Sequence, residues 1–354
     1  MPVQIITIRS KMQGPRRNGQ KKDCLFPVFP GKERLSPVHT YAGEGDLFPS
    51  GKENRSVFGP EIFIAVFFRI GYNTSIALYP CRFYRVNHER KNAMKILLTG
   101  ARGFAGARIA AAFPVIAAPS LKDAAEDDVK RLVDETEPDA IVHTAAISDI
   151  PTCENNPEAS WRANVQLPVW IAKTGIKAVL FSTDQVYGGC AGDSPCTEEE
   201  TAPANLYARH KLEMERRVLD VNPSAVLLRA TWMYDMPLYG VSNRGNFLMN
   251  MLLNREAAFS GTQHRAVTYV REVARWTERA LSLPGGSYNF GSENSLTMLE
   301  TAQWLKERLN LPIQLHDAGP RPHLWMNCAK ARAHGIQFMD TVDGLEQCIR
   351  DYAL

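Results

Sequence analysis

The chain has 354 residues, of which 45% are hydrophobic, and a formal net charge of +3. This length supports one large or two ordinary domains with a sizeable buried core. Residues 1–93 contain 15 Lys and Arg against 7 Asp and Glu, whereas residues 94–354 contain 26 against 31. The larger part is mildly acidic, which argues against a nucleic-acid partner there.

The cysteines and the apolar segments indicate where the protein works. Seven cysteines form no Cys-x-x-Cys pair, and eight histidines show no metal-ligand spacing, so we predict reduced thiols and no metal site. The first residues lack a cationic region followed by an apolar one, and Arg69, Asn73 and Thr74 interrupt the apolar run at residues 62–78. We therefore expect a cytoplasmic protein with neither signal peptide nor membrane span.

Residues 1–93 are rich in Pro, Gly, Lys and Arg and show no sustained period of 2 or 3.6. Such a segment does not easily form its own core, so we predict a largely unstructured extension. A basic targeting arm is one alternative, and a mis-assigned start upstream of Met94 is another. We favour an extension or a mis-assigned start, because Met94 directly precedes the first expected strand.

From Lys95 onward, strand patterns alternate with helix patterns. A buried strand is expected over residues 96–99, and a glycine loop and an alanine-rich helix over residues 105–113 follow it. Repeated strand-helix-strand units predict an α/β fold, a doubly wound parallel sheet that binds its ligand at the carboxyl ends of the strands. The later expected strands cover residues 114–118, 140–143, 178–181 and 225–228, and the helices cover residues 124–136, 157–173 and the segment with Tyr207 and Lys211.

The glycine loop is the first candidate site. Gly100, Gly103 and Gly106 follow a strand and open a helix, which is the context that a dinucleotide fingerprint requires. Glycines permit the tight turn and the approach of a pyrophosphate to the helix N-terminus. A purely structural strand-helix turn is the alternative. Small residues after His143, including Ala145 and Ala146, leave room for a cofactor or serve packing alone.

The end of the second strand bears on the choice of cofactor. Ala118, Pro119 and Ser120 supply no carboxylate that could bind the ribose 2′-hydroxyl of NAD. Arg102 in the glycine loop could pair with a 2′-phosphate, or it could be a solvated cation. We therefore favour NADP(H), with NAD(H) as the alternative.

Tyr207 and Lys211 are the candidate acid–base pair. Residues four apart share one helix face, where an ammonium favours phenolate over phenol and makes the tyrosine a usable acid or base. On its own, this spacing is more often a surface pair. Thr183 at the preceding strand end could hydrogen-bond a substrate oxygen beside Tyr207, although Ser-Thr-Asp is also good turn chemistry.

Together these motifs resemble the extended short-chain dehydrogenase/reductases, and within them the dTDP-4-dehydrorhamnose reductase family. The resemblance extends from Met94 to near the end of the chain, whereas residues 1–93 resemble nothing in that family. The matching runs are residues 97–100, 182–187, 207 with 211, 228–234, 246–247, 263–265 with 268, and 321–322.

The resemblance implies an NAD(P)H-dependent reductase of a nucleotide-bound 4-ketosugar, with formation of dTDP-L-rhamnose as the leading reaction. Tyr207 would give a proton to the C4 keto oxygen, and Lys211 would hold the cofactor ribose and lower the pKa of Tyr207. The implied catalytic residues are Thr183, Tyr207 and Lys211. The implied cofactor-binding residues are Gly100, Arg102, Gly103, Phe104, Ala105, Gly106, Ser120, Leu121, Ala145, Ala146, Ile147, Tyr207 and Lys211, and the implied substrate-binding residues are Thr183, Asp184, Trp232, Arg265 and Arg321.

Several alternatives stay open at this stage. Trp232 could be a core residue and each arginine a surface cation. Ser120 replaces a family acid and Ala208 a frequent glycine, which bears on substrate and cofactor choice. Another nucleotide-sugar reductase or epimerase fits the same fold. The family also resembles the regulatory subunit of methionine adenosyltransferase, although the intact Thr183, Tyr207 and Lys211 weigh against a purely regulatory role.

The predicted organisation follows from this resemblance. Residues 1–93 form the extension, residues 94–231 and about 266–290 form the NAD(P)-binding Rossmann domain, and about 232–265 and 291–354 form a small substrate-binding part. The expected partner is a nucleotide sugar, with no nucleic acid and no membrane. The sequence leaves open whether the protein is a homodimer and whether Mg²⁺ takes part.

Overall fold

The computed structural model describes residues 5–7, 62–70, 73–81, 94–238, 241 and 245–354. The chain divides into two compact units, Met1–Arg82 and Phe83–Leu354. Within the second unit, no described helix is long and apolar enough to cross a membrane.

Residues 1–93 were predicted to be largely unstructured, but the described part of the first unit contains strands. Strands β1 (Ile5–Thr7), β2 (Ile62–Ile70) and β3 (Asn73–Cys81) form an antiparallel sheet in the order β1-β2-β3. The sequence of β2 is a run of β-branched and aromatic residues, types that favour strands whatever their period. The rest of the expected extension lies outside the described residues.

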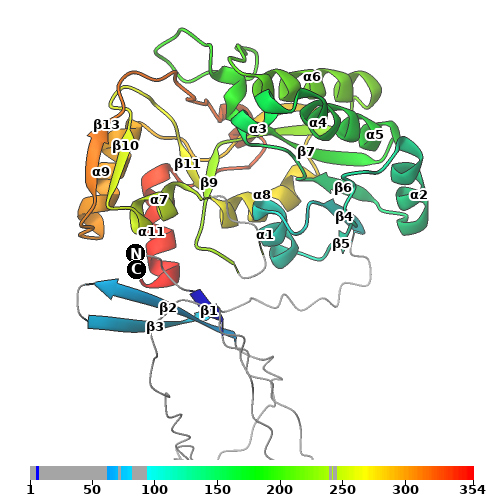
Figure 1. Ribbon diagram of the computed structural model, residues 1–354. Helices are drawn as coiled ribbons and strands as arrows, with labels where there is room; N and C mark the ends of the chain where they lie inside the picture. The colour runs from blue at the N-terminus through cyan, green and yellow to red at the C-terminus, as the bar shows by residue number, and fades with distance from the viewer. Residues whose placement is uncertain (1–4, 8–61, 71–72, 82–93, 239–240, 242–244) are drawn as a thin grey trace, which may run out of the picture. The chain divides into compact units, whose positions relative to one another are not determined.

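The second unit is built around a six-stranded parallel sheet, which confirms the predicted doubly wound α/β fold (Figure 1). Its spatial order is β12-β8-β7-β6-β4-β5. The chain moves outward from β4 to β5 and then returns to pair β6 on the other side of β4. This reversal opens a crevice at the carboxyl ends of β4 and β6. The strands are β4 (Ile96–Thr99), β5 (Ile116–Ala117), β6 (Ala140–His143), β7 (Lys177–Thr183), β8 (Val226–Ala230) and β12 (Gly286–Phe290).

Alternating strand residues build one core on each face of this sheet. Leu98 of β4 belongs to the core beneath α1 (Phe104–Ala112) and α8 (Val270–Ala280). Its neighbour Leu97 belongs to the opposite core, beneath α2 (Glu126–Thr136), α5 (Leu167–Lys173) and α6 (Leu206–Val221). Burial on both faces explains why the strands are continuous apolar runs.

The helix expected over residues 157–173 is three consecutive elements: α4 (Pro157–Trp161), a π-helical turn η1 (Arg162–Gln166) and α5. Pro168 lacks a backbone N–H and so cannot donate to the carbonyl four residues earlier. The interruption therefore has a local cause in the sequence.

The part after Trp232 is more regular than its sequence pattern indicated. Strand β9 (Trp232–Tyr234) pairs with β11 (Val267–Tyr269), and β10 (Glu256–Phe259) pairs with β13 (Gln314–Asp317), both in parallel. A separate apolar core joins these strands to the helices of this part. The remaining elements are α3 (Ile150–Asn155), the 3₁₀ turn η2 (Asp184–Tyr187), α7 (Phe247–Leu253), α9 (Met298–Arg308), α10 (Ala329–Ala333) and α11 (Thr341–Tyr352).

Candidate functional site

The glycine turn after β4 is fixed by close backbone packing. Gly100 has φ +76°, and a Cβ there would lie 2.7 Å from the Thr144 hydroxyl oxygen. A Cβ on Gly106 would lie 2.1 Å from the carbonyl oxygen of Gly100, so α1 can approach the turn only with glycine at this position. Gly103 precedes the first residue of α1, where free backbone N–H groups favour an anion. This cradle fits the pyrophosphate of a dinucleotide.

Two cavities meet at this turn. One of about 770 Å³ runs from the glycine turn to the loop after β5, and the other, of about 570 Å³, runs to the carboxyl ends of β7 and β8. Both are lined by Gly100, Gly103, Ala145 and Ala146, so they share one floor. A cofactor larger than either cavity can therefore lie across the sheet edge in both.

The first cavity collects Arg102, Ser120, Leu121 and Ile147 from the predicted cofactor residues. The second collects Phe104, Ala105, Tyr207, Lys211, Thr183, Asp184, Trp232 and Arg265. Gly106 does not line either cavity, because it packs behind the turn. Arg321 is exposed and lines neither of these two cavities, so the structure does not bring it together with the other predicted substrate-binding residues.

Helix α6 presents Tyr207 and Lys211 to the end of β7. The side chain of Asn205 caps the helix by accepting the Ala208 N–H at 2.9 Å, which fixes where the first turn begins. The Thr183 side chain lies next to Tyr207 in this cavity, and the Lys211 ammonium donates to the carbonyl of Phe181 at 2.7 Å. The three predicted catalytic side chains therefore share one cavity wall.

Burial controls the ionisation of these groups. It raises the pKa of Tyr207 above its usual value, and the nearby Asp184 carboxylate adds to this, while the polar Thr183 side chain opposes it. The expectation that Lys211 lowers the pKa of Tyr207 is wrong for this arrangement, because desolvation of the phenolate dominates. A high pKa keeps Tyr207 protonated, as a proton donor must be.

Lys211 and His143 are two buried ionisable residues that lie close together at the site. Burial lowers the pKa of Lys211 to about 8. Burial and the Lys211 charge lower the pKa of His143 to about 3, so this histidine is neutral. Its Nδ1 is 2.6 Å from the Thr99 hydroxyl oxygen, and its Nε2 has no partner among the described residues.

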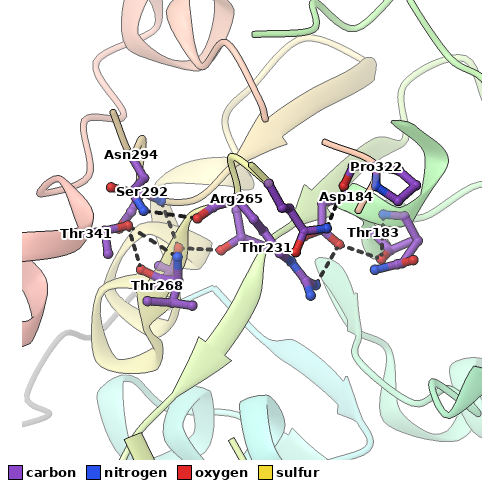
Figure 2. Close-up of polar contacts among 12 residues, drawn as sticks. Thr183, Asp184, Thr231, Arg265, Thr268, Ser292, Asn294, Pro322 and Thr341 are labelled. Atoms are coloured by element: carbon purple, nitrogen blue, oxygen red, sulfur yellow. Dashed lines mark hydrogen bonds and ion pairs between the residues drawn. The ribbon is translucent and has the colours of Figure 1, made fainter. Parts of the chain in front are cut away.

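An ion pair crosses the second cavity. The Arg265 guanidinium donates to Asp184 at 2.9 and 3.3 Å and lies 5.3 Å from the centre of the Trp232 ring. Asn294 donates to the Arg265 carbonyl at 3.0 Å and so holds its backbone (Figure 2). Segments 81 residues apart in the sequence are thereby joined in this cavity.

The π-turn η1 supplies two site contacts that sequence reasoning missed. The Asn164 side chain accepts from the Ile147 N–H at 3.1 Å and donates to the Ile147 carbonyl at 2.9 Å. Arg162 donates to the carbonyls of Lys122 and Ala124. Turn η1 therefore holds both rims of the first cavity. The signal for this turn in the sequence was Pro168, which interrupts the helix.

Asp123 and Lys122 also line the first cavity and were not predicted. Both residues follow β5 in the sequence. They come after Ser120, the position at which the resemblance implies an acidic residue. A carboxylate is therefore present near this cavity, together with three cations, Arg102, Lys122 and Arg162.

Comparison with known proteins gives the family. Residues 94–333 match the RmlD substrate binding domain. Methionine adenosyltransferase 2 subunit beta of Xenopus laevis is 30% identical over 238 residues, which cover 60% of this chain and 69% of that protein. A dTDP-4-dehydrorhamnose reductase of Burkholderia thailandensis is 29% identical over 204 residues, which cover 53% of this chain and 66% of that protein.

Solved structures share the fold at low identity. The dTDP-4-dehydrorhamnose reductase of Bacillus anthracis in complex with NADP superposes with TM-score 0.65 at 20% identity, over 73% of this chain and 99% of that one. UDP-glucose 4-epimerase of Thermus thermophilus in complex with NAD superposes with TM-score 0.60 at 20% identity, over 73% of this chain and 99% of that one. Over residues 94–333, the chain therefore belongs to the RmlD substrate-binding domain family of extended short-chain dehydrogenase/reductases.

Proposed function

We propose that the protein is an NADPH-dependent reductase of a nucleotide-bound 4-ketosugar, with dTDP-4-dehydrorhamnose as the leading substrate. The observation that carries this proposal is that Thr183, Tyr207 and Lys211 line one cavity that continues from the glycine turn. The reductase relatives and the NADP and NAD complexes among similar folds support the same reading. We also infer that residues of about 232–265 and 291–354 bind the sugar nucleotide, because Trp232 and Arg265 face this cavity.

The proposed reaction uses the residues as follows. When bound, NADPH would supply the hydride that adds to the keto carbon. Tyr207, kept protonated by burial, donates its proton to the oxygen on which negative charge develops. Thr183 lies next to that phenol, and the Lys211 ammonium holds helix α6 against the end of β7 by donating to the Phe181 carbonyl. Trp232 excludes water from the sugar side.

A screen of the full-length protein tests this function. The protein is mixed with NADPH or NADH and with a panel of nucleotide 4-ketosugars, and loss of the reduced-nicotinamide absorbance is followed. Turnover of at least one of these sugars is the expected result. Cofactor binding without turnover of any of them would contradict the proposed reaction.

A second function rests on the methionine adenosyltransferase subunit beta relatives, whose matches cover 69 and 70% of those proteins. On this reading the chain is a subunit of a methionine adenosyltransferase. Co-elution with a methionine adenosyltransferase catalytic subunit, together with an absence of ketosugar turnover, would favour it over the reductase.

The preference for NADPH is expected to depend on Arg102. Arg102→Ala should weaken NADPH binding about tenfold, because one charge-assisted hydrogen bond to the 2′-phosphate is lost, and should leave NADH binding unchanged. Fluorescence titration with both cofactors measures this. Arg131→Ala is the control, since Arg131 lies on α2 and lines neither cavity. An unchanged ratio of the two affinities would remove the reason for preferring NADPH.

Arg265 is expected to bind the diphosphate of the substrate. Arg265→Gln should raise KM for the nucleotide sugar about tenfold with little change in kcat, because the amide keeps a hydrogen bond to Asp184 but loses the charge. Steady-state kinetics at saturating NADPH measure this, and exposed Arg255→Gln serves as the control. A fall in kcat at constant KM would instead assign Arg265 to the chemical step.

A further inference from the structure

Glu215 lies one helical turn beyond Lys211 on the catalytic face of α6. Tyr207, Lys211 and Glu215 are spaced four residues apart and therefore project from one side of the helix. Their exposed fractions are 7%, 1% and 3%. A buried carboxylate is costly unless it is paired and fully hydrogen-bonded, so its partners indicate what it is for.

The Glu215 carboxylate is held by three neighbouring strands. Arg229 of β8 donates from Nε at 3.0 Å and from Nη2 at 2.7 Å. Ser287 of β12 donates at 2.9 Å, and the hydroxyl of Ser182 on β7 also donates to it. One side chain thus fixes α6 against β7, β8 and β12.

The contact with β7 is one of three adjacent contacts between this strand and helix α6. The Phe181 carbonyl accepts from the Lys211 ammonium, the Ser182 hydroxyl donates to Glu215, and Thr183 lies next to Tyr207. Three consecutive strand residues therefore each contact one of three residues on the helix face, two of them through hydrogen bonds. A shift of α6 along its axis would break all three contacts together.

The charges around Lys211 give Glu215 a second effect. Lys211 faces Glu215 on its own helix, the Cys153 thiol of α3 and the neutral His143 of β6. Burial lowers the pKa of Lys211, and the Glu215 carboxylate opposes this and favours the ammonium. Among these neighbours, only Glu215 carries a full negative charge when its carboxyl is ionised.

We propose that Glu215 is a positioning residue of the reductase site, which sets the register of Tyr207 and Lys211 against β7 and supplies the fixed negative charge that faces the Lys211 ammonium. This inference rests on the proposed function, in which Lys211 acts as a cation beside the cofactor. The role is distinct from contact with substrate, because Glu215 acts through Lys211 and through Ser182.

The test is Glu215→Gln in the full-length protein. The amide keeps the shape of the side chain and removes its charge, so the pKa of Lys211 should fall below about 8. The ammonium is then lost at lower pH. The alkaline limb of NADPH binding, measured by fluorescence between neutral and alkaline pH, should shift downward by about one pH unit. The alkaline limb of ketosugar turnover should shift with it.

A double variant separates charge from structure. Glu215→Gln alone leaves the Arg229 guanidinium buried without its partner, which destabilises the fold. Glu215→Gln with Arg229→Met removes both charges, so thermal unfolding should recover toward the wild-type midpoint while the pH shift remains. Recovery of the wild-type pH profile in the double variant would overturn the proposal and leave Glu215 a purely structural residue.

Glu213→Gln is the matched control. Glu213 lies on the same helix but pairs with Arg216 and Arg217 on the outer side, so its loss should leave the pH profile unchanged. NADPH binding needs no sugar, so the Glu215 test stands even if every ketosugar in the screen is inert. An unshifted alkaline limb of NADPH binding in Glu215→Gln would overturn the proposal.

Discussion

Tyr207→Phe is expected to lower turnover about 10²–10⁴-fold, the usual contribution of a positioned general acid, while NADPH binding stays within about twofold. The substitution removes the phenol proton and keeps the ring in its buried position. Among the described residues that line the second cavity, Tyr207 is the only tyrosine. Turnover at saturating cofactor and fluorescence titration of NADPH give the two readouts.

Tyr234→Phe is the control for this prediction. The Tyr234 hydroxyl is buried and has no hydrogen-bond partner among the described residues, so its removal deletes one oxygen without touching the site. Its turnover should match that of the wild type. Unaltered reductase activity in Tyr207→Phe would show that another group donates the proton, or that the scaffold serves a binding role.

Gly106→Ala should abolish NADPH binding and destabilise the protein by about 1–3 kcal/mol or more. The added Cβ would lie 2.1 Å from the Gly100 oxygen and 2.7 Å from the Gly100 carbonyl carbon, both backbone atoms. Helix α1 must then move away from the turn, which opens the cradle. Fluorescence titration and thermal unfolding measure the two effects.

Gly192→Ala is the corresponding control, because a Cβ there would meet only the Ser194 hydroxyl at 3.9 Å. Cofactor affinity and unfolding midpoint should both be close to wild type. If Gly106→Ala bound NADPH with wild-type affinity, the close approach of α1 to the glycine turn would not be needed for the cofactor.

Local sequence signals predicted the elements that carry the site. Strands β4 and β7 are largely continuous apolar runs that are buried on both faces. Such a run can be recognised in the local sequence without any long-range information. The glycine spacing and the Tyr207–Lys211 spacing are likewise local, and both lie where expected. The start of α9 was also readable, since Thr297 and Glu300 form a capping box, but the loosened pattern after Trp232 obscured it.

Long-range packing decided what the sequence could not. The ion pair between Asp184 and Arg265 joins residues 81 positions apart, and no local pattern links them. The raised pKa of Tyr207 comes mainly from desolvation, which depends on the finished core rather than on the neighbouring Lys211. Edge strand β12 follows β8 only after β9, α7, β10, β11 and α8, so its pairing with β8 required the tertiary structure.

If the protein acts on nucleotide sugars as proposed, the Asp184–Arg265 pair would make the second cavity selective by charge. Asp184 is almost fully buried and already neutralises the Arg265 guanidinium. A ligand therefore binds favourably to Arg265 only if it can compete with the Asp184 carboxylate. A free sugar has no anionic group with which to compete. A sugar that carries a diphosphate has negative charge that can pair with Arg265. The protein would then discriminate between the free sugar and the diphosphate-bearing sugar at the binding step, before any chemical step.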